Sequence, residues 1–174
     1  MGEYIENFVD ALPDPKRVKE IKKDLESKGV KYIYSHWIDF LGSPKTKPMP
    51  ISDFEDLCAG KGPQFAVHSV SFVPELGPAD NDQIPVPDLD SLLICPWDKT
   101  CAWVFSDLWW NGKPYDVCPR QTLKKQVKKN AEADLKFYVG MEPEFFVMKW
   151  EDGKPVKAID RDPIPLRRQA FGYD

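Results

Sequence analysis

The sequence predicts an α+β fold built on a mixed β-sheet. Helix and strand patterns are mixed along the chain without strict alternation, which favours this class over a doubly wound fold. The 174 residues include 17 prolines, about twice the usual share of roughly 5%. These prolines punctuate apolar runs, as expected for many short strands and turns. Aromatic residues make up 13% of the chain, including six Trp, which favours a packed, β-rich interior.

The first helix is predicted by signals at both of its ends. Asp14 can cap it, Pro15 suits the first helical position, and Gly29 is placed to end it. An apolar stripe at three- and four-residue spacing consists of Val18, Ile21 and Leu25. The stripe predicts that one side of this helix faces a core.

Five strands and one short helix are predicted over the next 80 residues. Ser52 and Glu55 have the spacing of a capping box for a short helix that Gly60 closes. Residues 74–90 are rich in Pro and Asp, which predicts a loop. The predicted strands are residues 31–40 and 45–49, on either side of a turn at 41–44, followed by 64–73, 92–95 and 101–107.

A further helix is predicted to begin at Pro119. Leu123, Val127 and Ala131 lie on one face, and a run of lysines that includes Lys124 is predicted to form the solvated face. Strands are predicted at 135–139, 144–150 and 156–159, the last two joined by a hairpin at 151–153. The helix marks a boundary between a first domain and a second that is too small to close a core. We therefore expect the chain to stop partway through a larger catalytic body.

Composition excludes several classes of protein. The net charge of −4 offers no basic surplus for nucleic acid, and no apolar run is long enough for a transmembrane helix. The N-terminus is acidic where a signal peptide would be basic. The four cysteines form no C-x-x-C pair, which predicts reduced thiols in a cytoplasmic protein. No phosphate-binding glycine motif occurs.

The sharpest chemical pattern is the pair Glu142 and Glu144 inside an apolar run. In an extended segment, residues two apart point to the same face, so the two carboxylates would lie together. The flanking aromatic residues predict burial, where two like charges are costly unless cations or protons neutralise them. Hard cations such as Mg²⁺ or Mn²⁺ suit carboxylate oxygens. The alternative is that one Glu lies on an exposed edge beside Pro143 and is merely solvated.

Four motifs, in the same order, resemble those of the glutamine synthetase family. The first is Trp37-Ile38-Asp39-Phe40-Leu41-Gly42 with Lys45 and Pro50, and the second is Asp82 with Pro87-Asp88. The third is Ser106-Asp107-Leu108 with Pro114-Tyr115 and Pro119-Arg120. The fourth is Gly140-Met141-Glu142-Pro143-Glu144-Phe145-Phe146. The resemblance runs from about residue 15 to the end of the chain.

The resemblance implies a domain organisation and a reaction. It implies an N-terminal tail (1–14), a β-grasp domain (15–113) and the start of a β-rich catalytic domain (114–174). In the family, the two Glu of the fourth motif bind divalent cations, so Glu142 and Glu144 inherit that role with Mg²⁺ or Mn²⁺. ATP phosphorylates the γ-carboxylate of glutamate, and an amine then displaces phosphate. The family forms homo-oligomeric rings, and this chain alone is expected to be inactive.

One departure from the family bears on the amine. Ala66 stands where the family has an Asp that binds ammonium, whereas Ser69 matches the family, and the resemblance implies that it is catalytic. Asp82 is the expected catalytic loop carboxylate, although an ungapped count favours Asp80. Losing the anionic partner of ammonium predicts an organic amine acceptor, with His68 a candidate proton acceptor.

Two alternatives to a ligase with an organic amine acceptor stay open. In the first, Asp80 or Asp82 supplies the missing carboxylate, and the protein is an ordinary glutamine synthetase that uses ammonia. In the second, the protein is a non-catalytic relative that uses the scaffold for assembly. The paired Glu142 and Glu144 argue against a scaffold, which has no reason to bury them.

Overall fold

The computed structural model describes residues 12–66 and 76–158, and it divides into two compact units. The first unit is Met1–Leu135 and the second is Lys136–Asp174. The chain therefore divides after the helix that follows Pro119, and the domain boundary expected at 113/114 stays a prediction.

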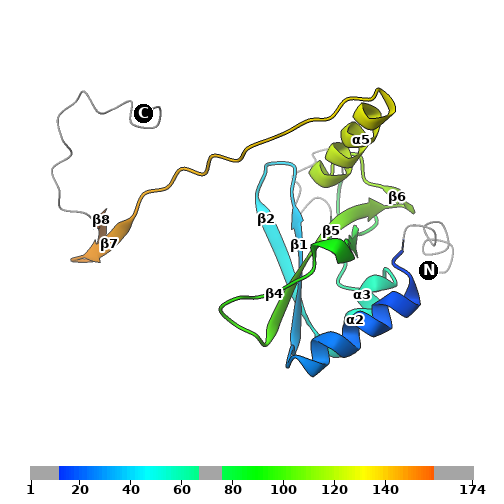
Figure 1. Ribbon diagram of the computed structural model, residues 1–174, viewed down its shortest axis with the longest axis horizontal. Coiled ribbons are helices and arrows are strands. Elements are labelled where there is room, and N and C mark those ends of the chain that lie inside the picture. The colour runs from blue at the N-terminus through cyan, green and yellow to red at the C-terminus, as the bar shows by residue number, and fades with distance from the viewer. Residues whose placement is uncertain (1–11, 67–75, 159–174) are drawn as a thin grey trace. The chain divides into compact units, whose positions relative to one another are not determined.

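A mixed sheet forms the centre of the first unit (Figure 1). Strand β1 (Tyr32–Ile38) pairs in parallel with β5 (Cys101–Trp110) and antiparallel with β2 (Pro44–Pro50). The second half of β5 pairs antiparallel with β3 (Ile84–Pro87), which completes the strand order β2-β1-β5-β3. Two short strands, β4 (Leu93–Ile94) and β6 (Lys113–Pro114), also pair with β5. The expected α+β class with a mixed sheet is confirmed.

The hairpin between β1 and β2 is closed by a buried carboxylate. The side chain of Asp39, only 3% exposed, accepts hydrogen bonds from the backbone N–H groups of Leu41 (3.0 Å) and Ser43 (2.8 Å). Gly42 has φ +81°, a conformation that other residues adopt at a cost. Lys45 lies 3.4 Å from the same carboxylate. The first of the four motifs is therefore a turn motif.

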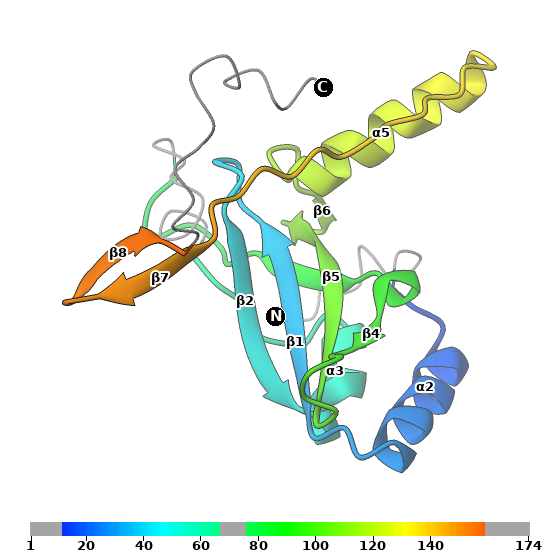
Figure 2. The same ribbon diagram turned by 60° about the vertical axis from the view of Figure 1, so that its left-hand side comes forward.

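Two helices cover one face of this sheet (Figures 1 and 2). Helix α2 (Pro15–Ser27) begins as predicted, with the Asp14 carboxylate accepting from the Lys16 N–H at 3.1 Å. A 3₁₀ turn, η2 (Ile51–Asp53), leads into the short helix α3 (Phe54–Cys58). Their core with the sheet contains Val18, Leu25, Val30, Ile33, Met49, Phe54, Leu57, Cys58, Leu89, Ala102 and Val104. The opposite face of the sheet exposes Tyr32 and Phe105.

The predicted capping box before α3 is wrong. The hydroxyl of Ser52 donates to the Asp53 carboxylate, and Glu55 accepts instead from the Lys22 ammonium at 3.2 Å. Because η2 begins at Ile51, Ser52 lies within the turn and cannot cap the helix that follows it.

The predicted loop at 74–90 is also wrong for its second half. Residues Ile84–Pro87 form β3, with all four residues buried, and Leu89–Ser91 form a 3₁₀ turn, η3. Pro85 and Pro87 are tolerated because β3 is an outer strand and both lie at positions where pairing with β5 requires no N–H donor. The predicted strand at 64–73 is described only to residue 66, where Phe65 forms a single bridge with Gln83.

Helix α5 (Pro119–Glu132) agrees with its prediction. In the second unit, β7 (Met148–Glu151) and β8 (Lys154–Lys157) form the predicted hairpin, with Asp152 at φ 50° and Gly153 at φ 74° in its turn. The predicted strand at 135–139 is wrong, and the one at 144–150 begins only at Met148. Residues 135–147 have no regular secondary structure, although the Val147 carbonyl accepts a hydrogen bond from the Ala158 N–H at 3.0 Å, just beyond the end of β8.

All four cysteines are free and buried, as predicted. Among the described residues, no helix has the length and apolar character needed to cross a membrane.

Phe54 is a sensitive probe of the core because its side chain is 0% exposed between α3 and the sheet. We expect Phe54→Ala to lower the free energy of unfolding by about 3–5 kcal/mol, through lost burial and the cavity left behind. Leu93→Ala, at a side chain that is 56% exposed, is the control and is expected to cost about 0.5 kcal/mol or less. Urea unfolding followed by circular dichroism measures both, and equal losses would contradict this description of the core.

Candidate functional site

The backbone brings Ala66 close to Asp82. Phe65 and Gln83 exchange two backbone hydrogen bonds, 3.3 Å from Phe65 N to Gln83 O and 2.8 Å from Gln83 N to Phe65 O. This bridge is antiparallel, so Ala66 and Asp82 each lie one residue beyond it, on facing segments. Ala66, the residue that replaces the expected Asp, therefore adjoins the same bridge as Asp82.

Aromatic and polar contacts hold this bridge in place. The ring of Phe65 stacks on Trp37, with centroids 4.3 Å apart and planes 7° from parallel. The Lys47 ammonium donates to the Gln64 carbonyl at 2.5 Å, so β1 and β2 both anchor the first segment. The second is anchored by the Trp110 indole N–H, which donates to the Asn81 carbonyl at 2.8 Å. Both segments of the bridge beside Ala66 are thus anchored to strands of the sheet.

The structure distinguishes the two loop aspartates. Asp80 serves its own turn, because its carboxylate accepts from the Gly77 N–H at 2.7 Å. Asp82 is the one next to the bridge, and both side chains are exposed. The Phe65–Gln83 bridge separates the two by position, and the assignment of Asp82 as the catalytic loop carboxylate stays a prediction. His68 and Ser69 lie outside the described residues.

Glu142 and Glu144 lie in the second unit and are exposed. The prediction that their segment is buried is wrong for this chain, since its apolar side chains are 56–89% exposed: Phe137, Tyr138, Val139, Phe145, Phe146 and Val147. Burial needs other elements to pack on these side chains, and none of the described residues does so. Within the described ranges, no group of three His, Cys, Asp or Glu residues is placed to hold a metal. The metal role of the pair stays a prediction.

A cluster of four charged residues joins α5 to the sheet. The Arg120 guanidinium donates to Asp107 on β5 at 3.0 Å and to Asp88, between β3 and η3, at 2.7 Å. The Lys124 ammonium donates to the same two carboxylates, at 3.2 Å to Asp88. Asp107 is 14% exposed, Asp88 23% and Arg120 26%. We call these four residues the ion cluster.

Sequence reasoning missed the ion cluster. It placed Lys124 on a solvated helix face, although Arg120 and Lys124 are four residues apart and therefore share one side of α5. Asp88, Asp107 and Arg120 come from the second and third motifs, so the motifs themselves carried the signal.

Charge pairing shifts two pKa values in the ion cluster. Burial acts to raise the pKa of Asp88, but the hydrogen bond and charge of Lys124 and the charge of Arg120 outweigh it, so the pKa is lowered. Burial likewise acts to lower the pKa of Lys124, and the hydrogen bonds and charges of Asp107 and Asp88 raise it instead. Both groups stay ionised across the neutral range.

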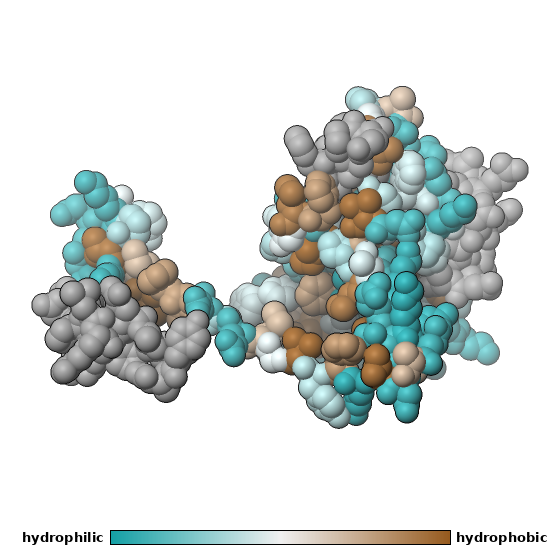
Figure 3. Space-filling model, turned by 90° about the horizontal axis from the view of Figure 1, so that it is seen from above, coloured by the Kyte–Doolittle hydropathy of each residue, from teal (hydrophilic) through white to brown (hydrophobic). Residues whose placement is uncertain are grey.

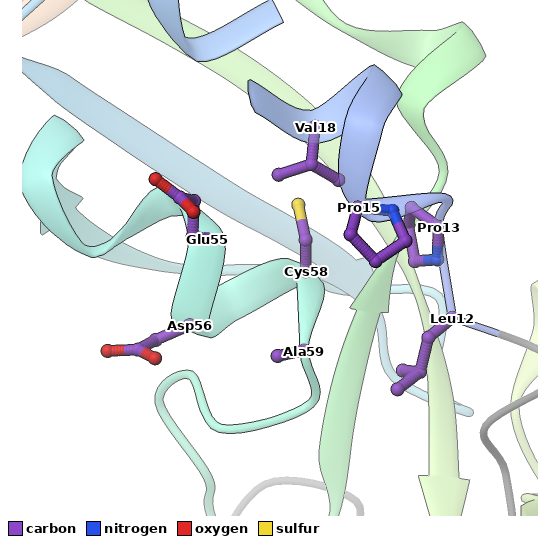
Figure 4. A pocket seen from close by; sticks show the side chains of 8 residues that line it. All are labelled: Leu12, Pro13, Pro15, Val18, Glu55, Asp56, Cys58 and Ala59. Atoms are coloured by element: carbon purple, nitrogen blue, oxygen red, sulfur yellow. The ribbon is translucent and has the colours of Figure 1, made fainter. Parts of the chain in front are cut away.

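An apolar cavity of about 330 Å³ lies between α2 and α3 (Figure 4). It is lined by Leu12, Pro13, Pro15, Val18, Glu55, Asp56, Cys58 and Ala59. Burial, with a smaller contribution from the charge of Glu55, raises the pKa of Cys58 to about 12. The thiol is therefore neutral at physiological pH and unsuited to nucleophilic catalysis.

Comparison with known proteins agrees with this fold and these motifs. The glutamine synthetase catalytic domain family matches residues 116–170. Glutamine synthetase of Rhizobium meliloti (strain 1021) is 35% identical over 142 residues, which are 82% of this chain and 32% of that protein. The glutamate–methylamine ligase of Methyloversatilis universalis is 31% identical over 147 residues, 83% of this chain and 33% of the ligase.

Solved structures show the same relationship. The GmaS/ADP complex aligns with a TM-score of 0.60 at 27% identity, and the aligned part is 65% of this chain and 26% of the GmaS chain. The ligand-free form of GmaS gives a TM-score of 0.61. The fold and motifs thus define a chain of the glutamine-synthetase-like class. The chain belongs to the glutamine synthetase family. It spans about a third of the length of the curated relatives that it matches.

The lowered pKa of Asp88 predicts how the stability of the folded chain depends on pH. A carboxyl pKa lowered in the folded state contributes stability above its unfolded value of about 3.9, and this contribution is lost as pH falls through the lowered pKa. We expect NMR titration to place the Asp88 pKa below the ordinary value and Lys124→Gln to move it upward.

The matched control is Lys125→Gln, which removes the partner of Asp116 instead. It should raise the pKa of Asp116 and leave that of Asp88 unchanged. An Asp88 pKa that does not respond to Lys124→Gln would contradict the described ion cluster.

Proposed function

We propose that this chain is the N-terminal part of an ATP-dependent glutamate–amine ligase. The observation that carries the proposal is similarity over more than four-fifths of the chain both to a glutamine synthetase and to a glutamate–methylamine ligase. In this proposal, residues 15–113 form a β-grasp domain, residues 114–174 begin the catalytic domain, and the chain alone is inactive. The whole enzyme assembles into a homo-oligomeric ring in the cytoplasm.

The proposed reaction proceeds through a γ-glutamyl phosphate. The γ-carboxylate of glutamate forms a bond to the terminal phosphorus of ATP, and ADP leaves. The amine nitrogen then attacks the acyl carbon, phosphate leaves, and a base takes the extra proton from nitrogen. Water must be excluded between the two steps, because it would hydrolyse the acyl phosphate.

Glu142 and Glu144 are the proposed ligands of Mg²⁺ or Mn²⁺. Their oxygens are the donors these hard cations prefer, and Mg²⁺ is commonly held by one or two carboxylates together with water and substrate phosphates. Two carboxylates are thus a fitting, though partial, ligand set. A bound cation would neutralise phosphate charge during transfer.

Ala66 supports an organic amine as acceptor. Ammonium is small and charged, so its site needs an anionic group at close range, and a methyl side chain supplies neither charge nor a proton acceptor. Ala also leaves space for an alkyl group. The similarity to a glutamate–methylamine ligase points the same way.

Ordinary glutamine synthetase activity, with ammonia, is the second candidate. The neighbourhood of Ala66 and Asp82 across the Phe65–Gln83 bridge favours it, because the Asp82 carboxylate could replace the missing one.

The amine preference of the full-length enzyme separates these candidates. We expect a higher kcat/KM for methylamine than for ammonium, and we expect Ala66→Asp to shift this ratio at least about tenfold towards ammonium. That shift is the size of a single hydrogen bond to a charged group, about 1.5–3 kcal/mol. Ala66→Asn matches the shape of Asp without its charge and should not produce the shift. A wild-type preference for ammonium would rule out the organic amine.

Removing the charge of Glu144 tests the metal assignment. In the full-length enzyme, Glu144→Gln keeps the shape of the side chain and is expected to lower kcat by about 10²–10³-fold, because phosphate charge is left uncompensated. The Mg²⁺ concentration needed for half-maximal activity should also rise. Glu151→Gln is the control, since Glu151 belongs to β7 and pairs with Lys149. Wild-type activity in Glu144→Gln would refute the assignment.

A further inference from the structure

Helix α5 is attached to the sheet with little apolar packing. The apolar face predicted for this helix is exposed to solvent, with Leu123 63% and Val127 59% exposed. The buried residue of the helix is Gln121. Seen from the α5 side, the surface shows hydrophobic residues in brown among the hydrophilic ones in teal (Figure 3). A helix of 14 residues is marginal in water by itself. Other contacts must therefore hold α5 on the sheet.

The ion cluster supplies such contacts at the start of α5. Arg120 and Lys124 lie one turn apart, and each bridges the same two carboxylates. The carboxylates come from separate segments of the sheet layer: Asp107 is on β5, while Asp88 follows β3 and donates its backbone N–H to the Phe105 carbonyl at 2.8 Å. The Arg120 guanidinium also lies over the Phe105 ring, 5.5 Å from its centroid.

This geometry is directional in a way that apolar packing is not. The Nε and Nη2 atoms of one planar guanidinium engage different carboxylates, so the pairing is satisfied only for a narrow range of helix orientations. The two carboxylates also share the ammonium of Lys124 and therefore lie close together. Without the cations they would repel each other in a partly buried setting.

We propose that Asp88, Asp107, Arg120 and Lys124 form an ionic clamp that sets the orientation of α5 on the sheet. Because α5 is followed along the chain by the segment that carries Glu142 and Glu144, we also expect the clamp to affect cation binding in the full-length enzyme. We assign these four as positioning residues, which act through the attachment of α5 to the sheet. The expected effect on cation binding rests on the proposed function, whereas the role of the clamp in orienting α5 does not.

Hydrogen exchange of the 174-residue chain tests the clamp directly. We expect α5 amides to exchange at least about tenfold faster in Arg120→Gln, with a smaller increase in Lys124→Gln, while amides of β1 and β5 are unchanged. Lys128→Gln is the matched control, because it removes the same charge from the same helix at an exposed pair with Glu132, 3.9 Å apart. It should leave α5 exchange unchanged.

Two outcomes would overturn the clamp. In one, α5 exchange is the same in Arg120→Gln as in the unsubstituted chain. In the other, all amides accelerate equally, which would show a general loss of stability. Arg120→Lys keeps the charge but loses the planar fork, so exchange should fall between Arg120→Gln and the unsubstituted chain.

The full-length enzyme tests the positioning role. We expect Arg120→Gln to raise the Mg²⁺ concentration for half-maximal activity and to lower kcat at least about tenfold, with partial recovery in Arg120→Lys. Unchanged kinetics, together with faster α5 exchange, would overturn the positioning role and leave the clamp standing. An unsubstituted enzyme without ligase activity would instead overturn the proposed function.

Discussion

The parallel pairing of β1 with β5 is the contact on which the rest of the first unit depends. Its register, from Tyr32 opposite Cys101 to His36 opposite Phe105, places Ile33, Ala102 and Val104 on one face, under α2 and α3. β5 then continues past the end of this pairing and binds β3 with its second half. The same strand therefore supports the core, the segment that carries Asp82, and the carboxylate of Asp107.

Local signals predicted the elements whose cause is local. The cap at Asp14, the turn predicted at 41–44 and the Asp152-Gly153 hairpin each depend on a few neighbouring residues, and each was identifiable in the sequence. The turn begins earlier than predicted, because the Asp39 side chain closes it. β3 was not, because its prolines indicate a loop and only pairing with β5 makes the segment a strand. The opposite error occurred at residues 135–139, which were predicted as a strand and have no regular secondary structure. Their composition is typical of a strand, but a strand needs a partner.

The candidate site shows the same limit at the level of single residues. The replacement at Ala66 and the Glu142–Glu144 pair were identifiable from sequence patterns. Which loop aspartate adjoins the Phe65–Gln83 bridge was not, since only the fold shows that Asp82 lies beside it while Asp80 bonds to its own turn. The burial of the glutamates was overestimated, because spacing reports which face a side chain shares and not what covers that face.

The prolines of the outer strands determine how copies of this chain can meet. In β2, residues 44, 46, 48 and 50 share one side of the backbone, and three of them are Pro. In β3, Pro85 and Pro87 likewise leave their side of the backbone without N–H donors. A further strand would find few hydrogen-bond donors at either of these edges, which protects the sheet from edge-to-edge aggregation. Any association between copies of the chain would therefore use side-chain surfaces rather than extension of the sheet through β2 or β3.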